Sequence, residues 1–230
     1  MKKDQNFTAY LYLFLTVTFW AGNFIVGKLA SFYDVPPFSL NFYRWFFAWL
    51  ILAPFTIPEI IEKKEYIFKN YKLFIILGVT SITIFNSIVY YSLNFPQVIS
   101  GVLMISTIPV MIMLFSSILN IEKTNIFQII GVIFSFAGVI MIITKADIQI
   151  LKNLDFNKGD ITMVVAMFSW ALYSTLLKRQ KYEISQISLL QVVITFGLLF
   201  LIPIYFIEYQ IGSRIILEKP FILILSYVVL

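Results

Sequence analysis

Long apolar stretches alternate with short polar segments along the whole chain. A helix of about 20 apolar residues, rising about 1.5 Å per residue, crosses the ~30 Å hydrocarbon core of a bilayer. Stretches of this length occupy 8–29, 38–57, 72–92, 98–118, 125–144, 160–178 and 186–207, and another begins near Pro220. The pattern predicts an all-α polytopic membrane protein with about seven complete transmembrane helices and the start of an eighth.

The composition narrows the class further. Hydrophobic residues make up 60% of the 230-residue chain and charged residues 13%, whereas soluble domains average about 45–50% and about 25%. The chain has no Cys and no His, which excludes disulfides, histidine metal sites and Ser-His or Cys-His catalysis. No Asp or Glu lies clearly within a predicted span, so paired carboxylates for hydrolysis are missing as well. We therefore expect neither an enzyme nor a cofactor or metal.

The basic residues predict the orientation in the membrane. If the N-terminus is cytoplasmic, the inner segments hold ten Lys and Arg residues and the outer loops hold five. An excess of positive charge inside is the usual arrangement of membrane proteins. We expect a multi-pass protein of the plasma (cytoplasmic) membrane, the inner membrane of a bacterial cell, with its N-terminus inside. Nucleic acid is not an expected partner.

Most prolines lie at or near the ends of predicted spans, where a missing N–H is tolerated, and Pro54 and Pro58 belong to this group. Pro109 is an exception because it lies in the middle of the span 98–118. It should kink that helix or free a carbonyl there.

Two parts of the chain resemble each other at an offset of 150 residues. The segment Phe19-Trp20-Ala21 with Lys28 aligns with Ser169-Trp170-Ala171 and Lys178, and Leu40-Asn41 aligns with Leu190-Gln191. Five predicted spans separate the two copies, and five is odd, so the second copy would cross the membrane in the opposite direction. This predicts an inverted repeat, an architecture of many secondary transporters, in which the substrate binds near the midplane between the copies.

Several side chains near the middle of the spans are candidates for function. Trp20 and Trp170 lie about a dozen residues into their spans, away from the interfaces where anchoring tryptophans gather. They either fill the core or line a substrate cavity. Asn23 must find a polar partner in the apolar interior, whereas Gly22 on the same helix permits close helix packing. Tyr173, which follows Trp170, is a further candidate.

Arg44 is the sharpest signal, because a guanidinium about six residues inside a span costs at least about 2.5–3.5 kcal/mol. It either faces a cavity and an anionic substrate or holds carbonyls freed by an irregular helix. Lys28 lies near the outer end of its span, where its long stem can reach the headgroups. Asn86, Tyr90 and Asn94 recur every four residues and form one polar stripe, facing either a cavity or the interface.

The same residues resemble the EamA family of the drug/metabolite transporter superfamily. The resemblance extends over about 200 residues. It rests on Trp20-Ala21-Gly22-Asn23-Phe24 with Lys28, Arg44, Pro109, Asn120-Ile121-Glu122-Lys123, Gly131, Gly138, Gly159-Asp160 and Ser169-Trp170-Ala171-Leu172-Tyr173.

This resemblance implies ten helices in two inverted five-helix repeats around a central cavity for small metabolites. Residues 1–145 would form the first repeat and residues 156–230 an incomplete second one. The chain would then be a fragment of a longer protein or the product of a truncated gene. Structural roles, as bends and close packing sites, would fall to Gly22, Lys28, Pro109, Glu122, Gly131 and Gly138.

Together these observations favour an alternating-access secondary transporter in the lipid bilayer, an exporter of small metabolites such as amino acids or amphipathic compounds. The alternative is a truncated protein that transports nothing, or a half-assembly that needs a partner chain; self-association is open. Arg44 would favour a carboxylate or phosphate, although the low charge within the spans also fits neutral or zwitterionic cargo. The predicted cavity residues are Trp20, Asn23, Arg44, Asn86, Tyr90, Trp170 and Tyr173.

Overall fold

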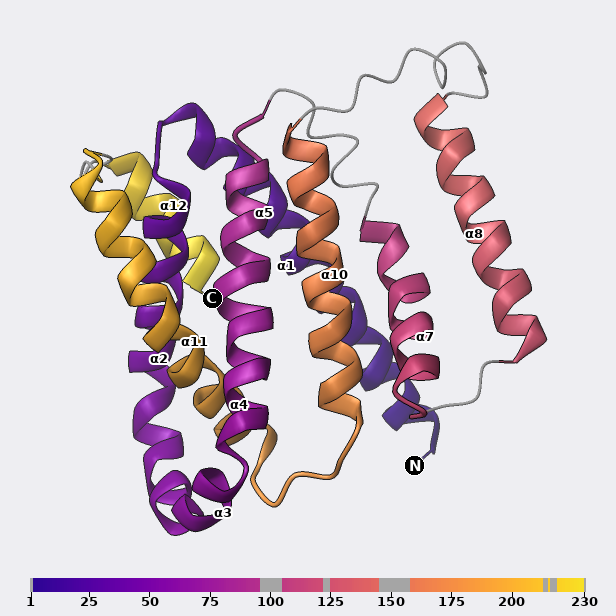
Figure 1. Ribbon diagram of the computed structural model, residues 1–230, viewed down its shortest axis with the longest axis horizontal. Helices are drawn as coiled ribbons and strands as arrows, with labels where there is room; N and C mark the ends of the chain where they lie inside the picture. Colours follow the sequence, from indigo (N-terminus) through magenta and orange to yellow (C-terminus); the bar gives the residue numbers. More distant parts are fainter. Residues whose placement is uncertain are drawn as a thin grey trace.

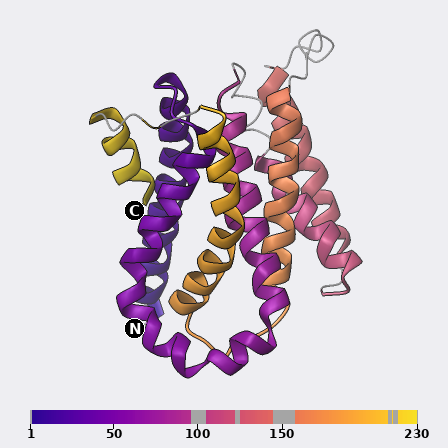
Figure 2. The ribbon, with the colours of Figure 1, turned by 60° about the vertical axis from the view of Figure 1, so that its left-hand side comes forward.

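The computed structural model describes residues 2–95, 105–121, 125–144, 158–212, 215 and 219–229, and these residues form helices and no strand. The long helices lie side by side in a bundle (Figures 1 and 2). The α-helices are α1 (Lys2–Phe32), α2 (Pro37–Glu62), α3 (Lys64–Lys69), α4 (Tyr71–Gly78), α5 (Ser87–Ser92), α7 (Ile108–Ile118), α8 (Ile126–Thr144), α10 (Lys158–Lys178), α11 (Gln186–Gln210) and α12 (Lys219–Val229).

Five helical segments of the described residues are long and apolar enough to cross a membrane. They are Phe7–Phe32, Pro37–Glu62, Tyr71–Ser92, Lys158–Lys178 and Gln186–Gln210. The chain is therefore an all-helical, multi-pass membrane protein that lies in a lipid bilayer, as predicted. The finer predictions of seven complete spans, an eighth and an inverted repeat stay predictions.

The proline expectations were wrong at Pro54 and Pro58. α2 continues through both Pro54 and Pro58 and ends at Glu62, five residues beyond the predicted span. Each proline removes one backbone hydrogen bond, but the rest of a 26-residue helix remains bonded. Pro109 lies in the first turn of α7, where no N–H is needed, and a 3-10 turn, Ile105–Thr107, directly precedes this helix. Residues 98–104 of the predicted span lie outside the described residues.

The third membrane-spanning segment contains an element that the sequence analysis did not predict. Between α4 and α5 the chain forms a π-helix, η1 (Val79–Asn86). Neighbouring helices supply hydrogen bonds to its backbone: Asn41 Nδ2 donates to the Ile82 carbonyl at 2.9 Å, and Ser169 Oγ donates to the Thr80 carbonyl at 2.7 Å. These bonds fix the π-helix between α2 and α10.

The second and seventh predicted spans became α2 and α11, which pack along each other. Glu208 of α11 accepts hydrogen bonds from the Phe38 and Ser39 N–H groups and from Ser39 Oγ, at the N-terminus of α2. At the other end Glu59 of α2 accepts bonds from Ser185 and Ser188, at the N-terminus of α11. The two antiparallel helices therefore cap each other, and each carboxylate lies where the helix dipole is positive.

Glycine allows the backbones of α4 and α11 to meet. A Cβ added to Gly78 would lie 2.6 Å from the Gly197 nitrogen and 2.7 Å from the Val193 carbonyl oxygen. In contrast, no described atom lies within 4 Å of a Cβ added to Gly131 or Gly138 on α8. The close packing expected at these two glycines is not found among the described residues, because α8 lies beyond α7 at the edge of the bundle (Figure 1).

This difference predicts the effect of a single methyl group. Gly78→Ala should lower the free energy of unfolding by about 1–3 kcal/mol, because backbone atoms of α11 cannot move away cheaply. Gly131→Ala is the matched control and should stabilise the protein slightly or leave it unchanged, since alanine favours a helix. Thermal unfolding of the purified protein in detergent measures both. Equal melting temperatures for the two variants would contradict this packing.

The reciprocal caps make a second prediction. Glu208→Ala should destabilise the protein by about 1–3 kcal/mol, because it leaves the N–H groups of Phe38 and Ser39 without an acceptor. Glu62→Ala is the control, since the Glu62 side chain is 70% exposed and pairs only with Lys63. Its melting temperature should stay within a degree or two of the wild type by the usual scale of such surface changes. A Glu208→Ala protein as stable as Glu62→Ala would show that the cap contributes nothing.

Candidate functional site

Four of the predicted cavity residues form one chain of hydrogen bonds. Arg44 Nη1 of α2 donates to Asn86 Oδ1 and to the Tyr90 hydroxyl, both at 2.9 Å. The Tyr90 hydroxyl donates in turn to Asn23 Oδ1 of α1 at 3.0 Å. Asn86 and Tyr90 are four residues apart, at the end of η1 and within α5, so the predicted stripe brings both side chains to Arg44.

Local packing holds this polar chain in place. Asn86 Nδ2 donates to the Ser81 carbonyl at 2.6 Å, which fixes the amide that faces Arg44. Gly27 of α1 makes room for Tyr90, because a Cβ at Gly27 would lie 3.0 Å from the Tyr90 ring. Asn94, the third residue of the predicted stripe, instead bonds the Tyr90 carbonyl of its own helix.

Lys28 and Arg44, the two cations singled out from the sequence, have different surroundings. Lys28 Nζ donates to the carbonyls of Leu93 and Phe95 at 2.8 and 3.0 Å, at the C-terminal end of α5. The Leu93 carbonyl belongs to the C-cap of α5, where the helix dipole is negative and offsets the charge. Arg44 lies about 10 Å along α2 from its first residue, and its partners are neutral groups and the ring of Trp45 at 4.8 Å. It forms no ion pair with a described residue.

The other three predicted cavity residues form an aromatic cluster. The rings of Trp20 and Trp170 lie 5.6 Å apart, and Tyr173 lies 5.0 Å from Trp170. Phe85 of η1 completes the cluster at 4.5 Å from Trp170. The tryptophans therefore pack against each other between α1 and α10, although Trp20 is still 41% exposed.

The polar chain and the aromatic cluster are neighbours in the fold. Trp20 and Asn23 are three residues apart and share a face of α1. Phe85 and Asn86 are consecutive in η1. The polar chain and the aromatic cluster thus lie on adjacent turns of α1 and η1, and together they offer a cation, amide and hydroxyl groups, and aromatic faces. Whether these residues line a substrate cavity stays a prediction.

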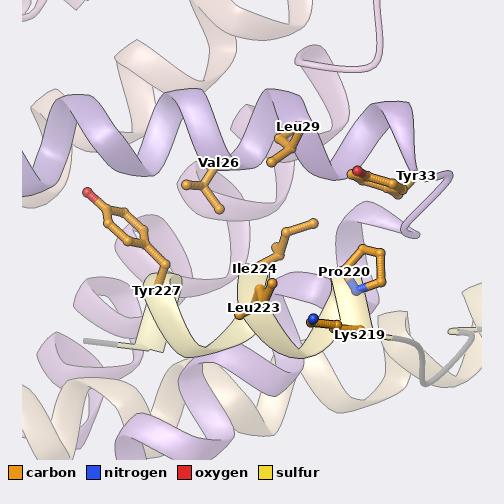
Figure 3. A pocket seen from close by; sticks show the side chains of 8 residues that line it. All are labelled: Val26, Leu29, Tyr33, Lys219, Pro220, Leu223, Ile224 and Tyr227. Carbon is orange, nitrogen blue, oxygen red and sulfur yellow. The ribbon is translucent and has the colours of Figure 1, made fainter.

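A separate pocket of about 370 Å³ lies between α1 and α12. Figure 3 shows its aliphatic wall, with Lys219 at one end and Tyr227 at the other. None of the seven predicted residues lines it. Gly22 does bear on it, because a Cβ there would lie 1.7 Å from the Tyr227 hydroxyl oxygen, so this glycine allows α12 to approach α1.

Several contributors were missed from the sequence. Phe85 and Trp45 directly precede or follow predicted residues, but nothing in their spacing shows which ring faces which helix. Glu59 and Glu208 were placed at or beyond the ends of spans, although both lie within helices and Glu208 is only 9% exposed. Their partners lie more than 100 residues away in sequence. Glu122 lies outside the described residues.

A multi-pass bundle of apolar helices with a polar and aromatic cluster between them defines this chain as an integral membrane protein with an internal site. Comparison with known proteins gives the family. The chain belongs to the EamA-like transporter family, which matches residues 7–144. The family resemblance seen in the sequence is therefore confirmed, and the matched part includes the whole polar chain from Asn23 to Tyr90.

Two curated relatives are themselves described as uncharacterized transporters. One, from Archaeoglobus fulgidus, is 26% identical over 202 residues, which cover 86% of this chain and 67% of the relative. The other, YyaM of Bacillus subtilis, is 29% identical over 117 residues, which cover 51% of this chain and 38% of the relative. The chain thus matches about two thirds of the length of the first relative and less than half of the second. No solved structure matches the chain.

The polar chain predicts a specific loss when the bridging hydroxyl is removed. Tyr90→Phe should destabilise the protein by about 1–3 kcal/mol, because Tyr90 is 2% exposed and its hydroxyl joins Arg44 to Asn23. Tyr91→Phe is the neighbouring control, since that residue is 38% exposed and should change stability by less than about 0.5 kcal/mol. Thermal unfolding in detergent distinguishes them. Equal melting temperatures of the two variants would show that the Tyr90 hydroxyl does not stabilise the protein.

Proposed function

We propose that this chain is a secondary transporter that works by alternating access and exports small metabolites such as amino acids or amphipathic compounds. The substrate binds beside the polar chain and the aromatic cluster. Two observations carry the proposal: four predicted residues form one hydrogen-bonded chain and the other three form one aromatic cluster, on helices early and late in the sequence. Membership of a transporter family supports the same function.

Alternating access needs two halves that can move against each other, and the proposed inverted repeat supplies them. In this proposal residues 1–145 are the first repeat and residues 156–230 belong to the second. Trp20 and Trp170 are equivalent positions at the offset of 150, and their rings are in contact. α2 and α11 are equivalent helices, and each caps the other. Contacts of this kind support a two-fold axis in the membrane plane between the halves.

The caps also supply contacts at both faces of the membrane. Glu208 binds α2 at one end of the pair and Glu59 binds α11 at the opposite end. With the N-terminus in the cytoplasm, as the charge bias suggests, the Glu208 cap lies at the outer face and the Glu59 cap at the inner face. Opening one end of the site while the other cap stays bonded would expose the central residues to one side at a time.

Labelling of single cysteines tests alternating access without knowledge of the substrate, because the chain has no Cys of its own. Asn23→Cys should react with a membrane-impermeant maleimide in right-side-out spheroplasts and also in inside-out vesicles. Met167→Cys, which is 0% exposed, should react in neither. Reaction of Asn23→Cys from one face only, or from none, would overturn alternating access at this site.

Orientation controls exclude mixed insertion as the cause of two-sided labelling. Tyr33→Cys lies between α1 and α2, and Lys181→Cys lies between α10 and α11. Each should react from one face only, Tyr33→Cys from outside and Lys181→Cys from inside. The reverse pattern would keep alternating access but would place the N-terminus outside.

A further inference from the structure

Arg44 differs from Glu59, Glu208 and Lys28 because, among the described residues, it pairs with no charged group and bonds no helix terminus. Glu208 and Glu59 bind helix N-termini, and Lys28 binds carbonyls at a helix C-terminus. Among the described residues, Arg44 Nη1 bonds the amide oxygen of Asn86 and the hydroxyl of Tyr90, and the guanidinium lies 4.8 Å from the Trp45 ring. In the described part of the chain its Nε and Nη2 donors form no hydrogen bond.

The geometry of a guanidinium makes those donors informative. It presents five N–H groups in a rigid fork, which matches the two oxygens of a carboxylate or two oxygens of a phosphate. Asn86 and Tyr90 accept from one nitrogen and so hold the plane of the group, while the nitrogens on its other edge remain for a ligand. A fixed fork with one edge used by neutral acceptors is suited to bidentate anion binding.

The apolar part of such a ligand also has a surface to contact. The shared face of α1 leads from Asn23 to Trp20, and from there to the rings of Trp170 and Tyr173. Aromatic faces bind flat or branched apolar groups. A cation beside an aromatic cluster therefore selects molecules that combine one negative group with a small apolar body.

We propose that Arg44 is the anion-binding point of this site, and that the substrate class is small amphipathic metabolites with a carboxylate or phosphate. This inference deepens the proposed function, since it names the chemistry that the transporter selects. Binding of an anion at Arg44 is nevertheless measurable without transport.

Two probes of the same shape test the charge requirement. Phenylacetate carries a carboxylate, and phenylacetamide replaces it with a neutral amide. Titration calorimetry with the full chain in phosphatidylcholine nanodiscs should show phenylacetate binding at least about tenfold more tightly than phenylacetamide, the factor expected for one charge-assisted pair. Arg44→Gln should remove this preference, so that the variant binds the two probes about equally.

Two further variants keep the test decisive. Lys28→Gln removes the other cation singled out from the sequence and should retain the full preference for phenylacetate. Arg44→Lys keeps the charge but loses the fork, and it should show a preference between those of the wild type and Arg44→Gln. Retained binding of phenylacetamide shows that a variant is folded. If Arg44→Gln does not fold, the two lysine variants test the proposal instead. Arg44→Lys should then show a weaker preference for phenylacetate than Lys28→Gln.

Four results would overturn the proposal: equal binding of the two probes by the wild type, no binding of either, a preference that survives Arg44→Gln, or a preference lost in Lys28→Gln. A lipid headgroup is the other source of such an anion. If phosphatidylglycerol in the nanodiscs weakens phenylacetate binding tenfold or more, Arg44 holds lipid and not a metabolite. If Asn23→Cys is labelled from both faces and any of these results is found, the proposal of an anion site at Arg44 is rejected. The proposal of alternating access is then retained.

Discussion

A bilayer offers no water to buried polar groups, so each of them must find a partner within the protein. This constraint explains the features that position the site. Backbone groups bond within helices, and the carboxylates of Glu59 and Glu208 bond the N–H groups that a helix start leaves open. Where η1 departs from α-helical geometry, Asn41 and Ser169 reach its carbonyls. Arg44 carries a full charge, but its hydrogen-bond partners among the described residues, Asn86 and Tyr90, are both neutral.

Pairing of α2 with α11 links this constraint to movement. Glu208, near the C-terminus of α11, bonds the N-terminus of α2, and Glu59, near the C-terminus of α2, bonds the N-terminal end of α11. The pair is therefore bonded at both of its ends. Between those ends the backbones of Gly78 and Gly197 nearly touch, which fixes the third span against α11. Arg44 lies on α2, between the two caps, and Asn86 and Tyr90 lie on the third span. A change at either cap would therefore reach the polar chain through α2.

The sequence was sufficient for those features that depend on periodicity and composition. Apolar length predicted the membrane helices, and a spacing of four residues predicted that Asn86 and Tyr90 share a face. Depth within a span singled out Trp20, Trp170 and Arg44. The two tryptophans contact each other, and Arg44 bonds Asn86 and Tyr90 of the third span. Apolar length, spacing and depth are properties of single helices, so a single sequence contains them.

Features that depend on contacts between helices were not predictable in this way. α2 continues past Pro54 to Glu62, and the partners of its Glu59 lie on α11, more than 100 residues away in sequence. The π-helix depends on side chains of α2 and α10, and the phenol that lies against Gly22 comes from α12. Pro109 has the same chemistry in a kink and at a helix start, and only the observed beginning of α7 distinguishes them.

The central claim is that the polar chain and the aromatic cluster together form the substrate site of a transporter. Counterflow in proteoliposomes tests it most directly. Vesicles that contain the protein and a high internal concentration of unlabelled phenylacetate should transiently accumulate radiolabelled phenylacetate from outside, and Arg44→Gln vesicles should not. Accumulation no greater than that of protein-free liposomes, or equal accumulation with Arg44→Gln, would contradict the account.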